Sequence, residues 1–263
     1  GLLYADGCVS INKNKCYTIS IGLQARDKHI LDFFNKELEY NKPLRFVDRT
    51  KETNKQNSYN VEIYSKIIAN DLIKLGCIPQ KTFTLKWPTP EQVPDDLIHH
   101  FIRGFFDGDG TASIDHKWSV PRMRFGIVGT FDICFNFRKY LVEKLNFNNI
   151  KIVHHHHTKD LYYVLYSGND NCRKFYNLIY NNMDENACLI RKREKFKFIF
   201  SVPIRVKTSK YKGISHREKD KLWIAFYSNS KDGKPIHIGS YKSEIEAKIA
   251  RDNFLSLHCV AQK

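Results

Sequence analysis

A short apolar segment that ends in aspartate and glycine occurs twice in this chain, once at its start and once near its middle. The first copy runs from Gly1 to Gly7 and the second from Phe101 to Gly110. Both copies have helical character, and the glycine after each aspartate is the residue that most readily leaves a helix. We therefore expect Asp6 and Asp109 in the last turns of two helices, and the duplication predicts two similar halves.

The expected position of Asp6 and Asp109 is unfavourable for a carboxylate, because the carboxyl end of a helix is its negative end. The cost is roughly 0.3–1 kcal/mol for each group, so a cation is needed nearby. Gly1 and Gly104 each lie five residues before their aspartate and would let two helices approach backbone against backbone. The pattern predicts two adjacent helices whose aspartates converge on a divalent metal ion.

The two segments resemble the motif of the LAGLIDADG homing endonucleases, a family in which two such helices form the central interface of a dimer or pseudo-dimer. Gly1 and Gly104 match the glycine of that motif, and Asp6 and Asp109 match its final acid. The resemblance implies that these aspartates bind Mg²⁺, for which Mn²⁺ can substitute. It also implies hydrolysis of DNA phosphodiester bonds across the minor groove, with one strand cut at each of two centres.

The motif has a second acidic position, at which the two copies differ. It is occupied by Asp107 in the second copy and by Tyr4 in the first. An acid that one half lacks cannot be a required ligand in both halves, so we do not assign Asp107 to the metal site.

Each half continues in the order helix-ββ-helix-ββ-helix. Apolar residues at three- and four-residue spacing predict the helices, and short runs of β-branched and aromatic residues between turn residues predict the strands. The first half is expected to contain strands at 8–11, 16–21, 44–47 and 59–64, a helix over 30–38 that Asp27 caps, and a helix at 67–75. The second half is expected to contain strands at 111–114, 123–128, 150–153 and 161–166, and helices at 131–145 and 171–180.

These elements predict an α+β fold of two pseudo-symmetric αββαββα halves, residues 1–92 and 93–205, whose two antiparallel sheets form a saddle. Between the halves lies the stretch from Trp87 to Pro94, in which three prolines exclude a continuous helix or a central strand. Residues 206–263 are expected to form a small third domain with a three-stranded sheet and a helix.

The composition indicates a folded protein with a polyanionic partner. The net charge is +15 and the sequence pI is about 9.4, which favours double-stranded DNA. No apolar run is long enough for a membrane span, and we find no signal peptide, although residues upstream of Gly1 are expected because the chain opens inside a helix. Seven scattered cysteines are typical of a reducing compartment, such as the cytoplasm of a bacterium or phage-infected cell, or an organelle.

The LAGLIDADG resemblance also implies polar and basic residues beside the metal site. A basic stretch follows the second helix of each half, and the match suggests Lys81 in the first half and Lys192 in the second as catalytic residues. Gln24, at the end of the second expected strand, resembles a family residue that positions water. Lys28 is a further candidate for DNA binding. For any single lysine, an ordinary phosphate contact is an equal alternative.

Four consecutive histidines, residues 154–157, lie in the second hairpin of the second half. Adjacent residues on an extended chain point to opposite faces, so they make a poor zinc site. We expect His155 and His157 to contact DNA instead.

The last domain has strands expected at 213–216, 223–227 and 235–238, followed by a helix from Ser243. Ser243 and Glu246 have the spacing of a capping box, and Ile245, Ile249 and Phe254 are expected to face inward. The domain resembles the APETALA/ethylene-response-factor type of DNA-binding domain through the stretches 211–214, 223–225, 238–241 and 246–252.

That second resemblance implies that the sheet enters the major groove. The residues expected near DNA are Arg217, Lys219, Lys221 and Trp223. Ser215 and Ser228 stand where that family often has arginine, so its target sequence is not carried over. The alternative is a small module that packs on the other two domains.

The leading interpretation is a monomeric, site-specific double-strand DNA homing endonuclease that requires Mg²⁺. Its origin, in a mobile intron, in an intein or as a free-standing gene, stays open. Two alternatives stay open. One is an intron-encoded maturase that binds intron RNA, and the other is a DNA-binding regulator without catalytic activity.

Overall fold

A computed structural model of the chain describes residues 1–51, 56–117, 121–156, 158, 160–202, 208–228 and 235–259. The chain divides into two compact units, residues 1–203 and 204–263. Both have α+β architecture, as expected from the sequence. Within the described residues, no helix combines the length and apolar character that a membrane crossing requires.

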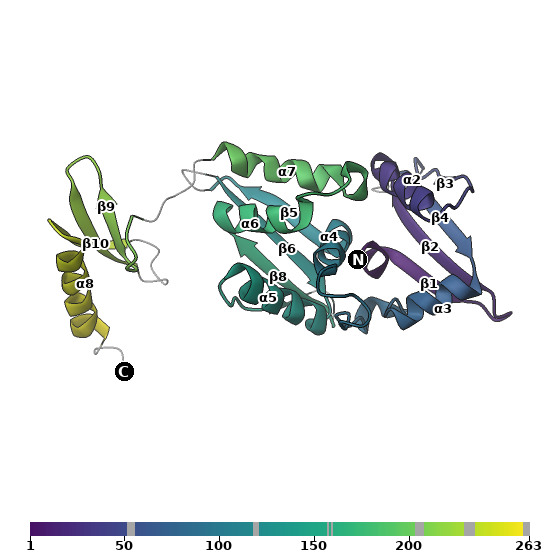
Figure 1. Ribbon diagram of the computed structural model, residues 1–263, viewed down its shortest axis with the longest axis horizontal. Helices are drawn as coiled ribbons and strands as arrows, with labels where there is room; N and C mark the ends of the chain where they lie inside the picture. The colour runs from purple at the N-terminus through teal and green to yellow at the C-terminus, as the bar shows by residue number, and fades with distance from the viewer. Residues whose placement is uncertain are drawn as a thin grey trace. The chain divides into compact units, whose positions relative to one another are not determined.

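The first half of the larger unit has two hairpins in one four-stranded antiparallel sheet of order β1-β2-β4-β3. Figure 1 shows this half in purple and blue. Its elements are α1 (Leu2–Ala5), β1 (Gly7–Ile11), β2 (Tyr17–Gln24), the 3-10 helix η1 (Ala25–Asp27), α2 (Lys28–Glu37), β3 (Arg45–Val47), β4 (Ser58–Tyr64), α3 (Lys66–Lys74) and the 3-10 helix η2 (Lys81–Phe83).

The second half repeats this topology with a sheet of order β5-β6-β8-β7, which confirms the predicted duplication. Its elements are α4 (Ile98–Asp109), β5 (Gly110–Asp115), β6 (Arg122–Gly129), α5 (Phe131–Leu145), β7 (Val153–His154), β8 (Tyr162–Ser167), α6 (Asn169–Tyr180), the 3-10 helix η3 (Glu185–Ala187) and α7 (Ile190–Ser201).

Two elements of the second half differ from the sequence prediction. The strand expected at 150–153 is displaced, and β7 contains only Val153 and His154. The Ile150 carbonyl accepts a hydrogen bond from Arg138 Nη1 at 2.8 Å, so a side chain takes the place of a strand partner. Helix α7 was not expected, and it carries Lys192.

The two motif helices, α1 and α4, pack against each other in the middle of the larger unit, where Figure 1 places α4 beside the N-terminus. A Cβ added at Gly1 would lie 2.0 Å from the carbonyl oxygen of Phe101. One added at Gly104 would lie 2.5 Å from the backbone nitrogen of Leu2. Each glycine therefore faces the backbone of the opposite motif helix, which cannot move aside unless the whole helix moves.

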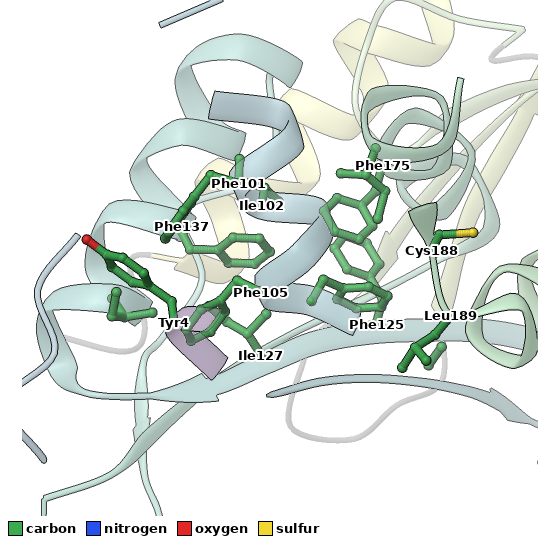
Figure 2. Close-up of a cluster of buried hydrophobic side chains, with 14 of the residues drawn as sticks. Tyr4, Phe101, Ile102, Phe105, Phe125, Ile127, Phe137, Phe175, Cys188 and Leu189 are labelled. Carbon is green, nitrogen blue, oxygen red and sulfur yellow. The ribbon is translucent and has the colours of Figure 1, made fainter. Parts of the chain in front are cut away.

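Aromatic side chains fill the space between α4 and the second sheet (Figure 2). Phe106 is completely buried and meets Phe175 edge-on at 5.1 Å between ring centroids. Phe125 stacks on Phe175 at 4.0 Å, and Phe101 meets Tyr4 of the first half edge-on at 4.9 Å. The seam between the halves is thus continuous with the core of the second half.

Tyr4 and Asp107, at the second acidic position of the motif, each connect their motif helix by hydrogen bonds to a later segment of the same half. In the first half, the Tyr4 hydroxyl donates to the Leu75 carbonyl at 2.6 Å. In the second half, the carboxylate of Asp107 accepts from the Tyr180 hydroxyl at 2.8 Å and from the Leu189 N–H at 2.9 Å. In the first half the tyrosine lies on the motif helix, whereas in the second half it lies at the end of α6 and donates to the motif helix. The second acidic position therefore has a packing role in both halves.

The smaller unit contains an antiparallel sheet of order β11-β10-β9 and one helix. Its elements are β9 (Ile214–Arg217), β10 (Leu222–Ser228), β11 (Pro235–Tyr241) and α8 (Glu244–Cys259). The predicted capping box is present, because Ser243 Oγ accepts from the Glu246 N–H at 3.2 Å and Glu246 Oε2 accepts from the Ser243 N–H at 3.3 Å.

The inward face predicted for α8 is wrong at two positions. Ile245 and Ile249 are exposed, with relative accessibilities of 63% and 53%, whereas Ala247 is completely buried. Ala247 belongs to one buried cluster with Ile214 and Ala225 of the sheet. Small residues on both sides let helix and sheet approach closely, and this contact turns the larger isoleucines outward.

We predict that Gly104→Ala destabilises the larger unit, although alanine normally favours a helix interior over glycine by about 1 kcal/mol. The new methyl group would collide with the α1 backbone, and overpacking of this kind typically costs about 1–3 kcal/mol. Denaturant unfolding of the full chain measures the difference. Gly22→Ala is the control, because the atom nearest its added Cβ belongs to the Asn60 side chain, which can rotate away. An unchanged or raised stability of Gly104→Ala would contradict the close helix contact.

Candidate active site

Asp6 and Asp109 lie at the ends of the two motif helices, and both are exposed to solvent. Asp109 is the last residue of α4, and Asp6 directly follows α1. A Cβ added at Gly108 would lie 2.9 Å from Asp6 Oδ2 and 2.3 Å from the Ala5 Cβ. The Asp6 carboxylate therefore rests against the last turn of α4, beside the helix end that carries Asp109.

The two carboxylates are close enough for the charge of Asp6 to affect the ionisation of Asp109. Partial burial, together with the charge of Asp6, raises the pKa of Asp109 to about 6. Partial burial also raises the pKa of Asp6, while the charges of Lys192 and Lys81 oppose that rise. Four of the predicted site residues, Asp6, Asp109, Lys81 and Lys192, thus form one electrostatic cluster.

Lys192 supplies the cation that the end of α4 requires. Its Nζ lies 2.8, 2.6, 3.0 and 2.6 Å from the carbonyl oxygens of Phe106, Asp107, Gly108 and Gly110. The residue is 5% exposed, and burial lowers its pKa to about 8. A buried ammonium among the last carbonyls of a helix offsets the negative end of the helix dipole.

Lys81 has a similar place in the first half. It is 8% exposed, and its Nζ donates a hydrogen bond to the carbonyl of Gly7, the residue after Asp6. Both lysines contact backbone carbonyls at the end of a motif helix, but Lys192 contacts four of them and Lys81 contacts one. In both halves, the lysine contacts the backbone next to the motif aspartate.

Gln24 is the last residue of β2, and its Oε1 is buried without a hydrogen-bond partner among the described residues. A buried amide oxygen of this kind is suited to hold an ordered water. Its role in positioning water stays a prediction. Lys28 lies one turn along the chain, where it pairs with Asp32 at 2.7 Å and lies over the Tyr59 ring.

Asp27 occupies the N-cap position of α2, as expected, but its side chain makes no cap hydrogen bond. Instead, its carboxylate accepts from Arg191 Nε at 3.0 and 3.2 Å, in the other half of the unit. The prediction of a capping role for the side chain is therefore wrong. A local helix rule cannot detect an arginine that is distant in sequence and reaches this position only through the fold.

Each half holds the lysine-bearing segment of the other half through the start of one helix. In the first half, His29 lies 3.0 Å from the Cys188 carbonyl, just before α7. In the second half, Thr130 caps α5 and donates its hydroxyl to the Leu85 carbonyl at 2.7 Å, just after η2. These contacts could not be predicted from the sequence, because no local pattern in either segment indicates which distant residue it will contact.

The donor set fits Mg²⁺ only in part. Among the described residues, no group of three or more His, Cys, Asp or Glu side chains could hold a metal ion. Mg²⁺ is commonly held by one or two carboxylates together with substrate phosphates and water, and this pair satisfies that requirement. Partial burial raises the pKa of both Asp6 and Asp109, and a bound cation would favour their charged forms.

The remaining predicted residues lie away from this cluster or outside the description. His155 follows β7 and donates its N–H to the Leu161 carbonyl at 2.8 Å, whereas His157 lies outside the described residues. In the smaller unit, Arg217 pairs with Asp220, Trp223 packs on the His216 ring, and two exposed lysines occupy the β9–β10 turn, Lys219 and Lys221.

Comparison with known proteins identifies the fold of the larger unit. No family model matches the sequence, and no curated protein matches it. Among solved structures, the LAGLIDADG homing endonuclease I-LtrWI bound to target DNA matches with a TM-score of 0.51 and 14% sequence identity, covering 76% of this chain and 87% of that chain. The meganuclease I-SmaMI bound to uncleavable DNA has a TM-score of 0.47 and 12% identity, covering 76% and 88%. At 14% identity, the likeness to I-LtrWI shows the fold alone.

We predict that Asp109→Asn stabilises the metal-free protein above pH 6. The pKa of Asp109 is about 6 in the fold and near 4 in an unfolded chain, so its contribution to stability falls as pH rises between these values. Asparagine removes this penalty. After allowance for the exposure of the carboxylate, the midpoint of thermal unfolding should rise by roughly 2–4 °C.

The measurement compares Asp109→Asn with the wild type at pH 5 and pH 8 in chelator, and the gain should shrink at pH 5. Asp32→Asn is the control, because that carboxylate lies in a surface ion pair. A gain that is equal at both pH values would argue against a carboxylate with a raised pKa at this position.

Proposed function

We propose that this chain is a site-specific DNA endonuclease that hydrolyses phosphodiester bonds with divalent metal. The observation that carries the proposal is the pair of aspartates at the ends of two helices in direct contact, each with a buried lysine beside it. A binding protein has no need for two neighbouring carboxylates whose pKa values are both raised. This supports the nuclease over a regulator without catalytic activity.

The chain's own residues define what each would do. Asp6 and Asp109 would hold the metal ions, and Lys81 and Lys192 keep the helix ends in place while adding positive potential for phosphate. Gln24 would orient water. Bound Mg²⁺ would supply a Lewis acid that activates water and stabilises the leaving oxygen. In the reaction, a water oxygen bonds to phosphorus and releases one proton to solvent, the bond between phosphorus and the 3′ oxygen breaks, and that oxygen takes one proton from solvent and leaves as a hydroxyl.

The face of each sheet that is turned away from the helices is the proposed DNA surface. On β2, Ile19 and Ile21 point into the core, so Thr18 and Ser20 lie on the opposite face. Each sheet also carries a pair of opposite charges, Arg45 with Glu62 at 2.9 Å and Arg124 with Asp115 at 3.6 Å. Strands that present donors and acceptors in this way can read base edges in the major groove.

The smaller unit is proposed to be a second DNA-binding domain of the APETALA type. Its exposed turn between β9 and β10 carries Lys219 and Lys221, next to Arg217 at the end of β9. Basic residues in such a turn can contact phosphates without reading sequence. The unit would then add affinity through a second contact on the same DNA molecule.

Cleavage is the first test. We expect the full chain to cut selected sites from randomised or genomic DNA in Mg²⁺ buffer, and to cut them in Mn²⁺. Asp6→Asn and Asp109→Asn should each lose at least about 10³-fold in rate, because one carboxylate cannot replace the other in holding the metal. Asp107→Asn is the matched control. It should keep the cut but lower stability, since this side chain serves packing.

The proposal of a nuclease would be overturned if wild type and Asp6→Asn bind the selected DNA equally and wild type leaves it intact. If the protein instead binds intron RNA and promotes splicing, the maturase would be the better assignment.

We expect a second test, deletion of residues 206–263, to weaken DNA binding or shift site preference and to leave the cut position unchanged. The reason is that both motif aspartates lie in the larger unit, 1–203. Sequencing of the cleaved ends locates the cut, and titration from 50 to 200 mM salt should weaken binding of the full chain by at least about 10³-fold. A displaced cut after deletion would contradict this assignment.

A further inference from the structure

We propose that Arg191, held in position by the buried carboxylate of Asp27, binds the scissile phosphate at one of the two centres and has no counterpart at the other. The two DNA strands would then be cut at different rates. This inference rests on the proposed endonuclease function and adds one residue with phosphate contact and one positioning residue to it.

The ion pair between Asp27 and Arg191 is partly buried, so it can fix the position of the guanidinium better than a surface ion pair could. The Asp27 side chain is 4% exposed and that of Arg191 is 35% exposed. Arg191 Nε lies 3.0 and 3.2 Å from the two carboxylate oxygens. Within the described residues, these are the hydrogen bonds that the guanidinium makes. Its two terminal nitrogens are left for another partner, and a guanidinium fixed at one edge suits the non-bridging oxygens of a phosphate.

The pair lies beside the site and bridges the two halves. Asp27 is three residues after Gln24, and Arg191 directly precedes Lys192, whose ammonium caps α4. The contact between His29 and the Cys188 carbonyl holds the same segment from the same side. The start of α7 is therefore fixed at three points, two in the first half and one on α4.

The corresponding positions in the other half carry different residues. Gln80 precedes Lys81, is exposed, and has a left-handed backbone with φ of 54°. Thr130 holds the N-cap position of α5 that Asp27 holds in α2, and its hydroxyl is used by the Leu85 carbonyl and the Ile133 N–H. Neither residue can supply a charge or a charged partner.

A guanidinium at one centre would stabilise the negative charge that grows on the phosphate oxygens as water attacks. Loss of a positioned donor of this kind typically costs about 10²–10³-fold in rate. The loss would fall on a single strand, since the other centre lacks the group. This restriction to one strand separates a phosphate contact from a structural role.

The experiment uses the full chain and a duplex that carries a selected site, with a different fluorophore at the 5′ end of each strand. We expect Arg191→Gln to slow one strand by at least about tenfold and the other by less than about twofold, so that nicked DNA accumulates. Asp27→Asn should slow the same strand by a smaller factor, because the arginine keeps its charge and loses its support. Gln80→Asn is the matched control, with neither rate changed.

Arg191→Lys guards against loss of folding, since it keeps the charge near Asp27 and loses the fork-shaped geometry. It should slow the same strand less than Arg191→Gln does, with an unchanged midpoint of thermal unfolding. Equal slowing of both strands by Arg191→Gln, or no slowing of either, would overturn the inference while the nuclease stands. A wild type that cuts no selected DNA would overturn the nuclease and the inference together.

Discussion

The direct contact between the backbones of α1 and α4 is the constraint on which the rest of the larger unit depends. It brings the negative ends of two helices together, and each end carries an aspartate. Such an arrangement is unfavourable unless positive charge enters it. Lys192 and Lys81 supply that charge from buried positions. The lysines are thus explained first by the fold, and their proximity to the proposed reaction follows from the same placement.

This reasoning also explains why the lysine-bearing segments are held so firmly. A buried ammonium is stable only while its acceptors stay in place, because an unpaired buried charge is costly. Lys192 depends on α7 starting at the correct point, and both the Asp27–Arg191 pair and the His29 contact fix that point. Lys81 depends on η2, which Thr130 holds through Leu85. Each half therefore stabilises the charge balance of the other.

The duplication, the order of elements and most boundaries could be predicted from the sequence, because each depends on local patterns. The helix at 131–145 matches α5, and the capping box of α8 has the expected hydrogen bonds. The failures have a common cause. Asp27, Ile245 and β7 were assigned by local rules, whereas a distant arginine, a buried alanine contact and a side-chain hydrogen bond to Ile150 determine their structures.

Helix α7 was missed for a related reason. Its sequence mixes lysine, arginine and phenylalanine without a clean apolar stripe, because opposite sides of the helix contact protein. Phe196 packs into the aromatic core, while Lys192 and Lys195 donate to carbonyls of α4 and β5. A helix that buries both rings and ammonium groups does not show the amphipathic pattern on which a sequence prediction relies.

The unequal details of the two halves follow from their presence in one chain. In a symmetric dimer, each residue at the interface occurs twice, so any change is made in both subunits at once. Here the two copies can change separately. Tyr4 and Asp107 solve one packing problem in opposite ways, and Gln80 and Arg191 occupy one position with different chemistry. The fold requires only that each helix end be neutralised. Residues that are not needed for this neutralisation can differ between the halves. Gln80 and Arg191, next to the two lysines, are the differing residues that lie beside the proposed active site.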